Sequence, residues 1–308
     1  MKKNIISPFI LLCSFLYLLT LFVSCVEEEP VETSDPNTNT YIRSGDILVA
    51  STGNRAVILL DSEGNFKSVL FSAAKMQSQA ANIGSIAYEK STGNILVSVY
   101  DTLTPDRIWS INTSTGKATT KIQNAATAVT AAGMTALLQL EDGRILTSEA
   151  AATFDIYNAA GTLITNGSAA PQIAGNLTDA NPRSAGGLIA CSASQTKVYD
   201  SSFAQIGATR AGAINGCLEI APDQYIVSDG AVIRHFNNVT NAVWTGAWSF
   251  TNGNYIAAPR GLAVNASGEI LVSDITFDHI AVLDADGNFS RIINPGVLSD
   301  PTRIVIIP

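Results

Sequence analysis

Hydrophobic and polar positions follow one another in short runs through most of the chain, and residues 259–293 show the pattern most clearly. Four runs rich in Ile, Leu, Val and Ala are each as long as a strand and too short for a helix. They are residues 261–264, 270–273, 280–283 and 289–293. Asn265-Ala-Ser-Gly and Asp284-Ala-Asp-Gly separate runs with the residue types of tight turns. This segment predicts a small four-stranded antiparallel sheet.

The same succession of runs and turns recurs upstream, which predicts an array of similar sheets. One copy comprises residues 84–88, 94–98, 107–112 and 117–122, and a second comprises 134–140, 144–148, 154–157 and 162–165. A third comprises residues 217–220, 225–228, 232–236 and 242–248, with Asp223 in the turn where the others carry Gly. A degenerate copy occupies residues 169–209. Repeated four-stranded units of this length are typical of β-propeller blades.

The two ends of the repeat array complement one another. Residues 46–72 contain a second, a third and a fourth strand but no first, and residues 303–307 are a lone first strand. Pairing the two fragments gives a sixth blade and removes the exposed edges of an open array. The fold class predicted is all-β: a propeller of six four-stranded blades, closed by pairing of the C-terminal strand with the N-terminal blade strands. A seven-bladed ring, or a miscount at the degenerate copy, is the alternative.

One repeat resembles a known family. Pro259-Arg-Gly-Leu-Ala-Val, followed by Gly268-Glu-Ile-Leu-Val-Ser-Asp and His279-Ile-Ala-Val-Leu-Asp-Ala-Asp-Gly-Asn-Phe, is similar to an NHL repeat. The similarity is good over residues 259–293, fair over 46–71 and loose between them. The resemblance implies a six-bladed propeller whose ligands meet the mouth of the central channel.

The N-terminus has the layout of an export signal. Lys2 and Lys3 precede an apolar run over residues 9–23, and Leu21-Phe22-Val23-Ser24-Cys25 resembles a bacterial lipobox. We therefore expect residues 1–25 to be a lipoprotein-type signal peptide and Cys25 to carry a lipid such as palmitate. An uncleaved signal anchor over residues 5–23 is the alternative, because that stretch could just span a bilayer.

A polar segment follows Cys25. Residues 26–40 are acidic and interrupted by Pro, which predicts a disordered tether ahead of a propeller over residues 41–308. Acids close behind the cysteine resemble the surface-export signals of some Bacteroidetes lipoproteins. We expect a lipid-anchored protein of the bacterial cell envelope, in the outer membrane or at the cell surface.

Composition limits the partners. Hydrophobic residues make up 46% of the chain and charged residues 14%, with 23 glycines, so the chain has enough apolar surface for a large core. A net charge of −8 argues against nucleic acid as a partner. Of the four cysteines, Cys191 and Cys217 fall in the repeats. An exported protein permits a disulfide between them, and two buried free thiols are the alternative.

Charged residues recur where the channel mouth is expected. Asp101, Glu149, Asp229 and Asp274 come just after second strands. Four carboxylates around one mouth could bind Ca²⁺, or each could cap its own turn. Arg183, Arg260 and Arg303 follow prolines at the expected starts of blades. They could hold an anionic ligand, or pair with neighbouring acids and tie blades together.

Catalytic signatures are sparse. The two histidines, His235 and His279, lack metal-ligand spacing, and no nucleophile elbow, Walker loop or Cys-x-x-Cys is present. Gluconolactonase-like propellers use Glu, Asn and Asp on a divalent metal; Glu89, Asn215, Glu219 and Asp229 have those residue types without a family motif. Trp109, Trp244 and Trp248, with Tyr100 and Phe277, could form an aromatic platform for sugar, or fill blade cores.

These observations predict a noncatalytic binding or scaffold module for a protein, peptide or glycan at the cell envelope. The main alternative is a metal-dependent hydrolase or lactonase of the gluconolactonase-like type. A structural subunit of an envelope complex is the third class, and it predicts an apolar patch on the outer rim.

Overall fold

The computed structural model describes residues 42–101, 104–123, 134–148, 154–165, 177–236 and 249–308. They belong to a compact unit spanning Thr40–Pro308. Cys25, the predicted leader and the whole predicted tether lie outside the described residues, as do Glu149, Trp244 and Trp248. Among the described residues, no helix has the length and apolar character needed to cross a bilayer.

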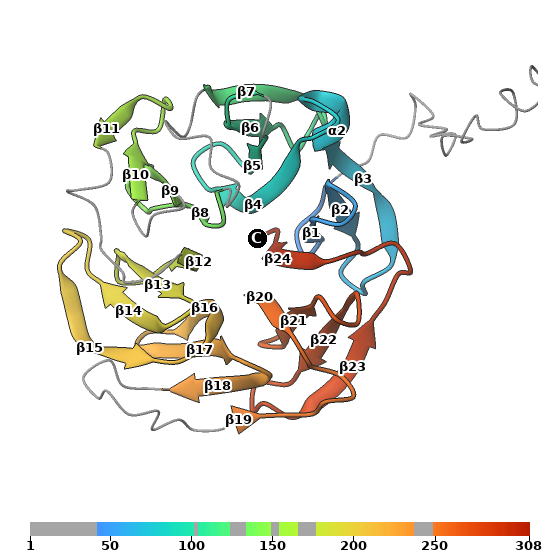
Figure 1. Cartoon of the computed structure of the whole chain (residues 1–308), viewed down its shortest axis with the longest axis vertical. Helices are drawn as coiled ribbons and strands as arrows, with labels where there is room; N and C mark the ends of the chain where they lie inside the picture. The colour runs from blue at the N-terminus through green and yellow to red at the C-terminus, as the bar shows by residue number, and fades with distance from the viewer. Residues whose placement is uncertain (1–41, 102–103, 124–133, 149–153, 166–176, 237–248) are drawn as a thin grey trace, which may run out of the picture. The chain divides into compact units, whose positions relative to one another are not determined.

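Six four-stranded antiparallel sheets form the blades of a β-propeller (Figure 1). Blade 1 contains β24 (Pro301–Ile306), β1 (Ile47–Ser51), β2 (Ala56–Leu60) and β3 (Phe66–Ser72). Blade 2 contains β4 (Asn82–Glu89), β5 (Asn94–Tyr100), β6 (Arg107–Ile111) and β7 (Ala118–Gln123). Blade 3 contains β8 (Leu137–Gln139), β9 (Ile145–Ser148), β10 (Phe154–Tyr157) and β11 (Leu163–Thr165).

The remaining blades follow in chain order. Blade 4 contains β12 (Leu177–Pro182), β13 (Leu188–Ser192), β14 (Gln195–Tyr199) and β15 (Gln205–Ala211). Blade 5 contains β16 (Ile214–Ala221), β17 (Gln224–Asp229), β18 (Val232–Phe236) and β19 (Ser249–Phe250). Blade 6 contains β20 (Pro259–Val264), β21 (Ile270–Asp274), β22 (His279–Leu283) and β23 (Phe289–Ile293). A short helix, α2 (Ala73–Met76), follows β3.

The ring closes as the sequence predicts. β24 at the C-terminus pairs antiparallel with β1 near the N-terminus, with Leu48 opposite Val305. Blade 1 thus takes its innermost strand from one end of the chain and its other three from the other end (Figure 1). The six-bladed fold class is confirmed, and the degenerate copy is one complete blade, blade 4.

Burial explains why the second and third strands read as unbroken apolar runs. Every residue of β1, β2, β21 and β22 is buried. Both faces of these strands pack against neighbouring blades, so polar side chains at alternate positions would be buried away from solvent. The outermost β3 and β23, by contrast, carry exposed positions.

Turn chemistry also follows the prediction. Gly268 and Gly287 have φ values of 82° and 81°, in the left-handed region that favours glycine. Ahead of them, the side-chain oxygens of Asn265 and Asp284 accept backbone N–H groups within the same turns. Asp223 stands where other copies carry Gly and adopts a φ of 59°.

Candidate functional site at the channel mouth

One end of the central channel opens into a cavity of about 300 Å³. The cavity is bordered by residues near the starts of first strands and the ends of second strands, so all six blades contribute to it. The lining residues are Thr52, Ile83, Gly84, Tyr100, Thr135, Thr178, Asn215, Arg260, Ile275, Asp300 and Thr302. Its volume is at the lower end for ligand pockets and suits one small chemical group of a partner.

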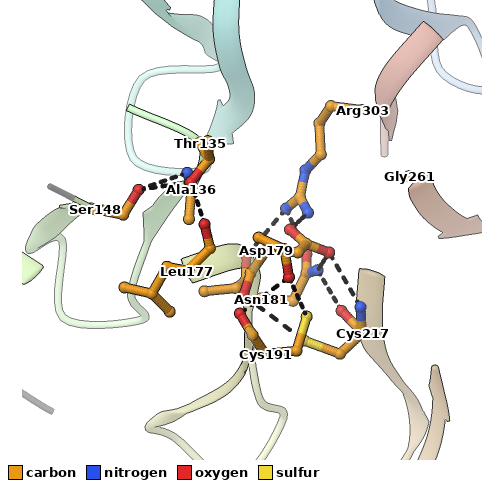
Figure 2. Close-up of polar contacts among 12 residues, drawn as sticks. Thr135, Ala136, Ser148, Leu177, Asp179, Asn181, Cys191, Cys217, Gly261 and Arg303 are labelled. Atoms are coloured by element: carbon orange, nitrogen blue, oxygen red, sulfur yellow. Dashed lines mark hydrogen bonds and ion pairs between the residues drawn. The ribbon is translucent and has the colours of Figure 1, made fainter. Parts of the chain in front are cut away.

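Threonine hydroxyls in the cavity wall join neighbouring blades. The hydroxyl of Thr135 donates to the carbonyl of Leu177 at 2.5 Å (Figure 2), and that of Thr178 donates to the carbonyl of Ile214 at 2.9 Å. Because each hydroxyl proton is used within the protein, these side chains offer a ligand only methyl groups and oxygen lone pairs.

Arg260 supplies the positive charge of the cavity. Its Nη1 donates to the Asn215 side-chain oxygen at 2.6 Å, which links blade 6 to blade 5. Within the described part of the chain, no carboxylate forms an ion pair with Arg260. The guanidinium therefore keeps further N–H donors that the described carboxylates do not use in ion pairs, suited to a carboxylate or another acceptor of a ligand.

A buried ion pair crosses the channel (Figure 2). Arg303 on β24 of blade 1 pairs with Asp179 on β12 of blade 4, the blade on the opposite side of the ring. Its Nη2 also donates to the Ala180 carbonyl at 3.1 Å and to the Asn181 side-chain oxygen at 2.8 Å. Arg303 and Asp179 follow the cavity-lining Thr302 and Thr178 by one residue, so we infer that the cavity ends at this cross-channel pair.

Burial has an electrostatic cost at the cross-channel pair. Arg303 is 5% exposed and Asp179 is 3% exposed. Desolvation lowers the pKa of Arg303 to about 10, which still leaves the guanidinium charged at neutral pH. The opposing carboxylate compensates that charge, so Arg303 follows the blade-tying alternative of the sequence analysis.

The described members of the predicted carboxylate ring hold their own loops. Asp274 accepts four backbone N–H bonds at 2.7–3.2 Å, from Ala257, Ala258, Thr276 and Phe277. Asp229 accepts the N–H of Ala213 at 3.0 Å and pairs with Arg234 at 2.8 Å. Asp101 accepts the hydroxyls of Ser78 and of Thr104, the latter at 2.8 Å. Among the described residues, these acids do not gather into a group that could hold a metal ion.

Arg183 lies at the other end of its strand from the predicted position. Pro259 and Pro301 begin β20 and β24, whereas Pro182 ends β12. The Pro-Arg pair of blade 4 therefore marks the end of a first strand and not its start. Arg183 donates to the Tyr225 hydroxyl at 2.9 Å and lies 3.6 Å from a Glu219 oxygen.

The residues considered for a gluconolactonase-like metal site are spread over separate contacts. Glu89 is buried and pairs with Lys121 at 2.8 Å, and Glu219 contacts Arg183. Asn215 is bonded to Arg260, and Asp229 pairs with Arg234. Within the described ranges, Glu89, Glu219 and Asp229 do not belong to a group of acidic, His or Cys side chains close enough to hold a metal ion.

The described members of the predicted aromatic platform are separated. Trp109 is 8% exposed and packs against Phe71 with ring centroids 5.9 Å apart, in the core of blades 1 and 2. Phe277 stacks on His279, with ring centroids 5.4 Å apart. Tyr100 borders the cavity, so it alone of these three lies at the mouth.

A serine position that the sequence analysis did not single out recurs in all six blades. It lies near the end of each second strand and is fully buried in each: Ser51, Ser98, Ser148, Ser192, Ser228 and Ser273. Ser98 and Ser273 accept the N–H of Ser85 and of Gly261, at 2.7 and 2.8 Å. Both donors lie where the first strand bulges, and a bulge leaves a backbone group without a strand partner. Aligning the repeats on Leu-Val-Ser would have found it.

A second cavity, of about 460 Å³, lies between blades 6 and 1 and is bordered by Glu269 and Arg291. These two side chains form a bidentate ion pair, with Nη2 and Oε2 3.0 Å apart. The charge of Arg291 is thus already compensated by Glu269, so this larger cavity is a weaker anion site than the cavity at the mouth.

Known structures share the fold. A chain in the crystal structure of a nidogen/laminin complex matches with a TM-score of 0.62 and 12% identity, over 85% of this chain and 98% of that one. A protein of unknown function from Bacteroides caccae matches with a TM-score of 0.60 and 11% identity, over 86% and 99% of the two chains. The WD40 propeller domain of Doa1 matches with a TM-score of 0.54 and 12% identity, over 81% and 79%.

No protein-family model matches the sequence, and no curated protein matches it either. At these identities the structural matches establish the fold class alone. The class of protein that fold and comparisons define is a six-bladed β-propeller.

Proposed function

We propose that this chain is an exported, lipid-anchored, NHL-like β-propeller that acts as a noncatalytic binding or scaffold module at the bacterial cell envelope. The observation that carries the proposal is Arg260, which has no ion-pair partner among the described residues, in a small cavity bordered by all six blades. A rigid ring that presents one charged donor beside polar and apolar side chains is suited to recognition. The partner is a protein, peptide or glycan that places an acidic or acceptor group in the mouth.

Two further points support binding over catalysis. Asp229 and Asp274, two described acids of the mouth region, accept backbone N–H groups of nearby loops, which leaves these two little freedom for general acid-base work. A matching propeller comes from a complex of nidogen and laminin, and such a protein complex is a precedent for recognition by a propeller. Among the described residues, no comparable observation favours the hydrolase alternative.

Replacing Arg260 with glutamine should weaken partner binding about 10- to 100-fold, the worth of a charge-assisted hydrogen bond. Glutamine keeps an N–H donor for Asn215, so we expect the melting temperature to stay close to that of the wild type. The measurement is binding of the full chain to an array of defined peptides and oligosaccharides, arranged as acidic and neutral pairs.

Arg291→Gln is the matched control, because Arg291 borders the other cavity and is paired with Glu269. It should bind the same acidic members as the wild type. Equal binding by Arg260→Gln and the wild type, or binding to no acidic member, would count against the mouth as the recognition site.

The lipid anchor has its own test. Bacteria expressing the full chain should incorporate radiolabelled palmitate into it, and Cys25→Ser should lose the label. Cys13→Ser is the matched control, since Cys13 lies in the same leader but outside the lipobox, and it should keep the label. A wild-type chain that stays in the membrane fraction without label would support the uncleaved anchor over residues 5–23.

A further inference from the structure

Two buried cysteines from neighbouring blades face one another beside the cross-channel pair (Figure 2). Cys191 lies on β13 of blade 4 and Cys217 on β16 of blade 5, and neither is exposed. Their sulfur atoms and a carboxylate oxygen of Asp179 all lie within 4.8 Å of one another. Both cysteines are free thiols in the structure. This group could hold a thiophilic metal ion, or the two sulfur atoms could bond to each other.

The contacts of Asp179 decide against a metal ion. One carboxylate oxygen accepts the N–H of Cys217 at 3.1 Å and the side-chain amide of Asn181 at 3.2 Å. The other oxygen pairs with Arg303. A cation at this position would displace these donors and lie beside a buried guanidinium, and the two sulfur atoms alone do not complete a tetrahedral site.

The two thiols lie in apolar surroundings. Cys191 and Cys217 share a hydrophobic cluster with Ile189, Ile214 and Val227. Burial raises the pKa of the Cys217 thiol well above its ordinary value. The Cys217 sulfur is 3.8 Å from the Asp179 carbonyl, and the Cys191 sulfur is 3.5 Å from the Thr178 hydroxyl. Oxidation is therefore slow once the blades have closed and is favoured while the chain is still folding.

We propose that Cys191 and Cys217 form a disulfide between blades 4 and 5 when the chain folds in the presence of a disulfide oxidant. One cysteine thiolate attacks the oxidant's sulfur–sulfur bond, forms a mixed disulfide and releases one thiolate. The second cysteine thiolate then attacks the mixed disulfide and releases the other. The two cysteines together lose two protons and two electrons, and the oxidant is reduced to two thiols. The new bond joins β13 to β16 next to the channel.

The chain allows a direct test by peptide mapping. The full chain, in mild detergent, is unfolded under reducing conditions, refolded with oxidised and reduced glutathione, alkylated without further reduction and digested with trypsin. Arg210 separates the two cysteines, so cleavage gives peptides 184–197 and 211–234. We expect these two peptides to be joined, and to separate when dithiothreitol is added.

Thermal unfolding gives a second readout. The oxidised wild type should melt about 5–10 °C above the same protein after reduction, since the bond restricts the unfolded chain. The Cys191→Ala/Cys217→Ala double variant should not respond to the reductant. Separately alkylated Cys191 and Cys217 after oxidative refolding would overturn the proposal. So would a bond from either cysteine to Cys13 or Cys25, or one zinc ion per chain released by a thiol reagent.

Discussion

Replacing Arg303 with methionine is expected to destabilise the propeller by about 3–5 kcal/mol, the cost of leaving a buried charge without its partner. The variant keeps a long apolar side chain in the channel but leaves Asp179, which is 3% exposed, without its ion-pair partner. In urea unfolding of the full chain in mild detergent, the midpoint should fall while the slope stays unchanged.

Two companion variants make the Arg303→Met result specific. Arg291→Met breaks an ion pair in which the arginine side chain is 40% exposed, so it should cost less than about 1 kcal/mol. Asp179→Asn combined with Arg303→Met should recover part of the lost stability, because asparagine has no unpaired buried charge and keeps an acceptor for the Cys217 N–H. A loss for Arg303→Met no larger than that for Arg291→Met would show that the cross-channel pair contributes little.

The fold could be predicted from the sequence because each blade repeats the same local pattern of apolar runs and turns. Apolar runs of strand length, the turns at Asn265 and Asp284, and the lone strand in residues 303–307 all carry their information within a few neighbouring residues. Ring closure followed because a missing first strand at one end matched a spare strand at the other.

In blade 4, local sequence patterns were not sufficient to predict the position of a residue in its strand. Pro182-Arg183 resembles Pro259-Arg260 in sequence, yet the first pair ends a strand and the second begins one. The difference depends on which strand of the blade contains the pair, and the degenerate copy lacks the turn signals that would have fixed that register. Strand assignment therefore determined at which end of its strand the arginine lies.

The site itself depends on contacts between distant blades. Asp179 was not a candidate because nothing local distinguishes it from any other acid in a strand. Its role comes from Arg303, more than a hundred residues away in sequence, and from Cys217 on the next blade. Arg260 was predicted to approach the mouth, and it borders the cavity. That it lacks a carboxylate partner within the described residues is a property of the assembled ring.

Close approach of neighbouring blades near the axis leads to the second large effect, expected for Gly216→Ala. A Cβ at position 216 would lie 2.1 Å from the carbonyl oxygen of Arg260, a backbone atom that cannot turn away. The φ of Gly216 lies outside the left-handed region, so the cost comes from overpacking alone, at about 3 kcal/mol. Gly253→Ala is the matched control, because nothing lies within 4 Å of the added methyl group.

The Gly216→Ala variant should also connect stability to recognition. Because the added methyl group pushes on the Arg260 backbone, and Asn215 next to Gly216 holds the guanidinium, both ends of Arg260 should move. We therefore expect weaker binding of acidic array members under conditions where the variant is still folded, together with a lower urea midpoint. Gly253→Ala should change neither measurement. If Gly216→Ala lowered the midpoint and left binding intact, blade packing and the position of Arg260 would be independent, and recognition would have to lie elsewhere on the ring.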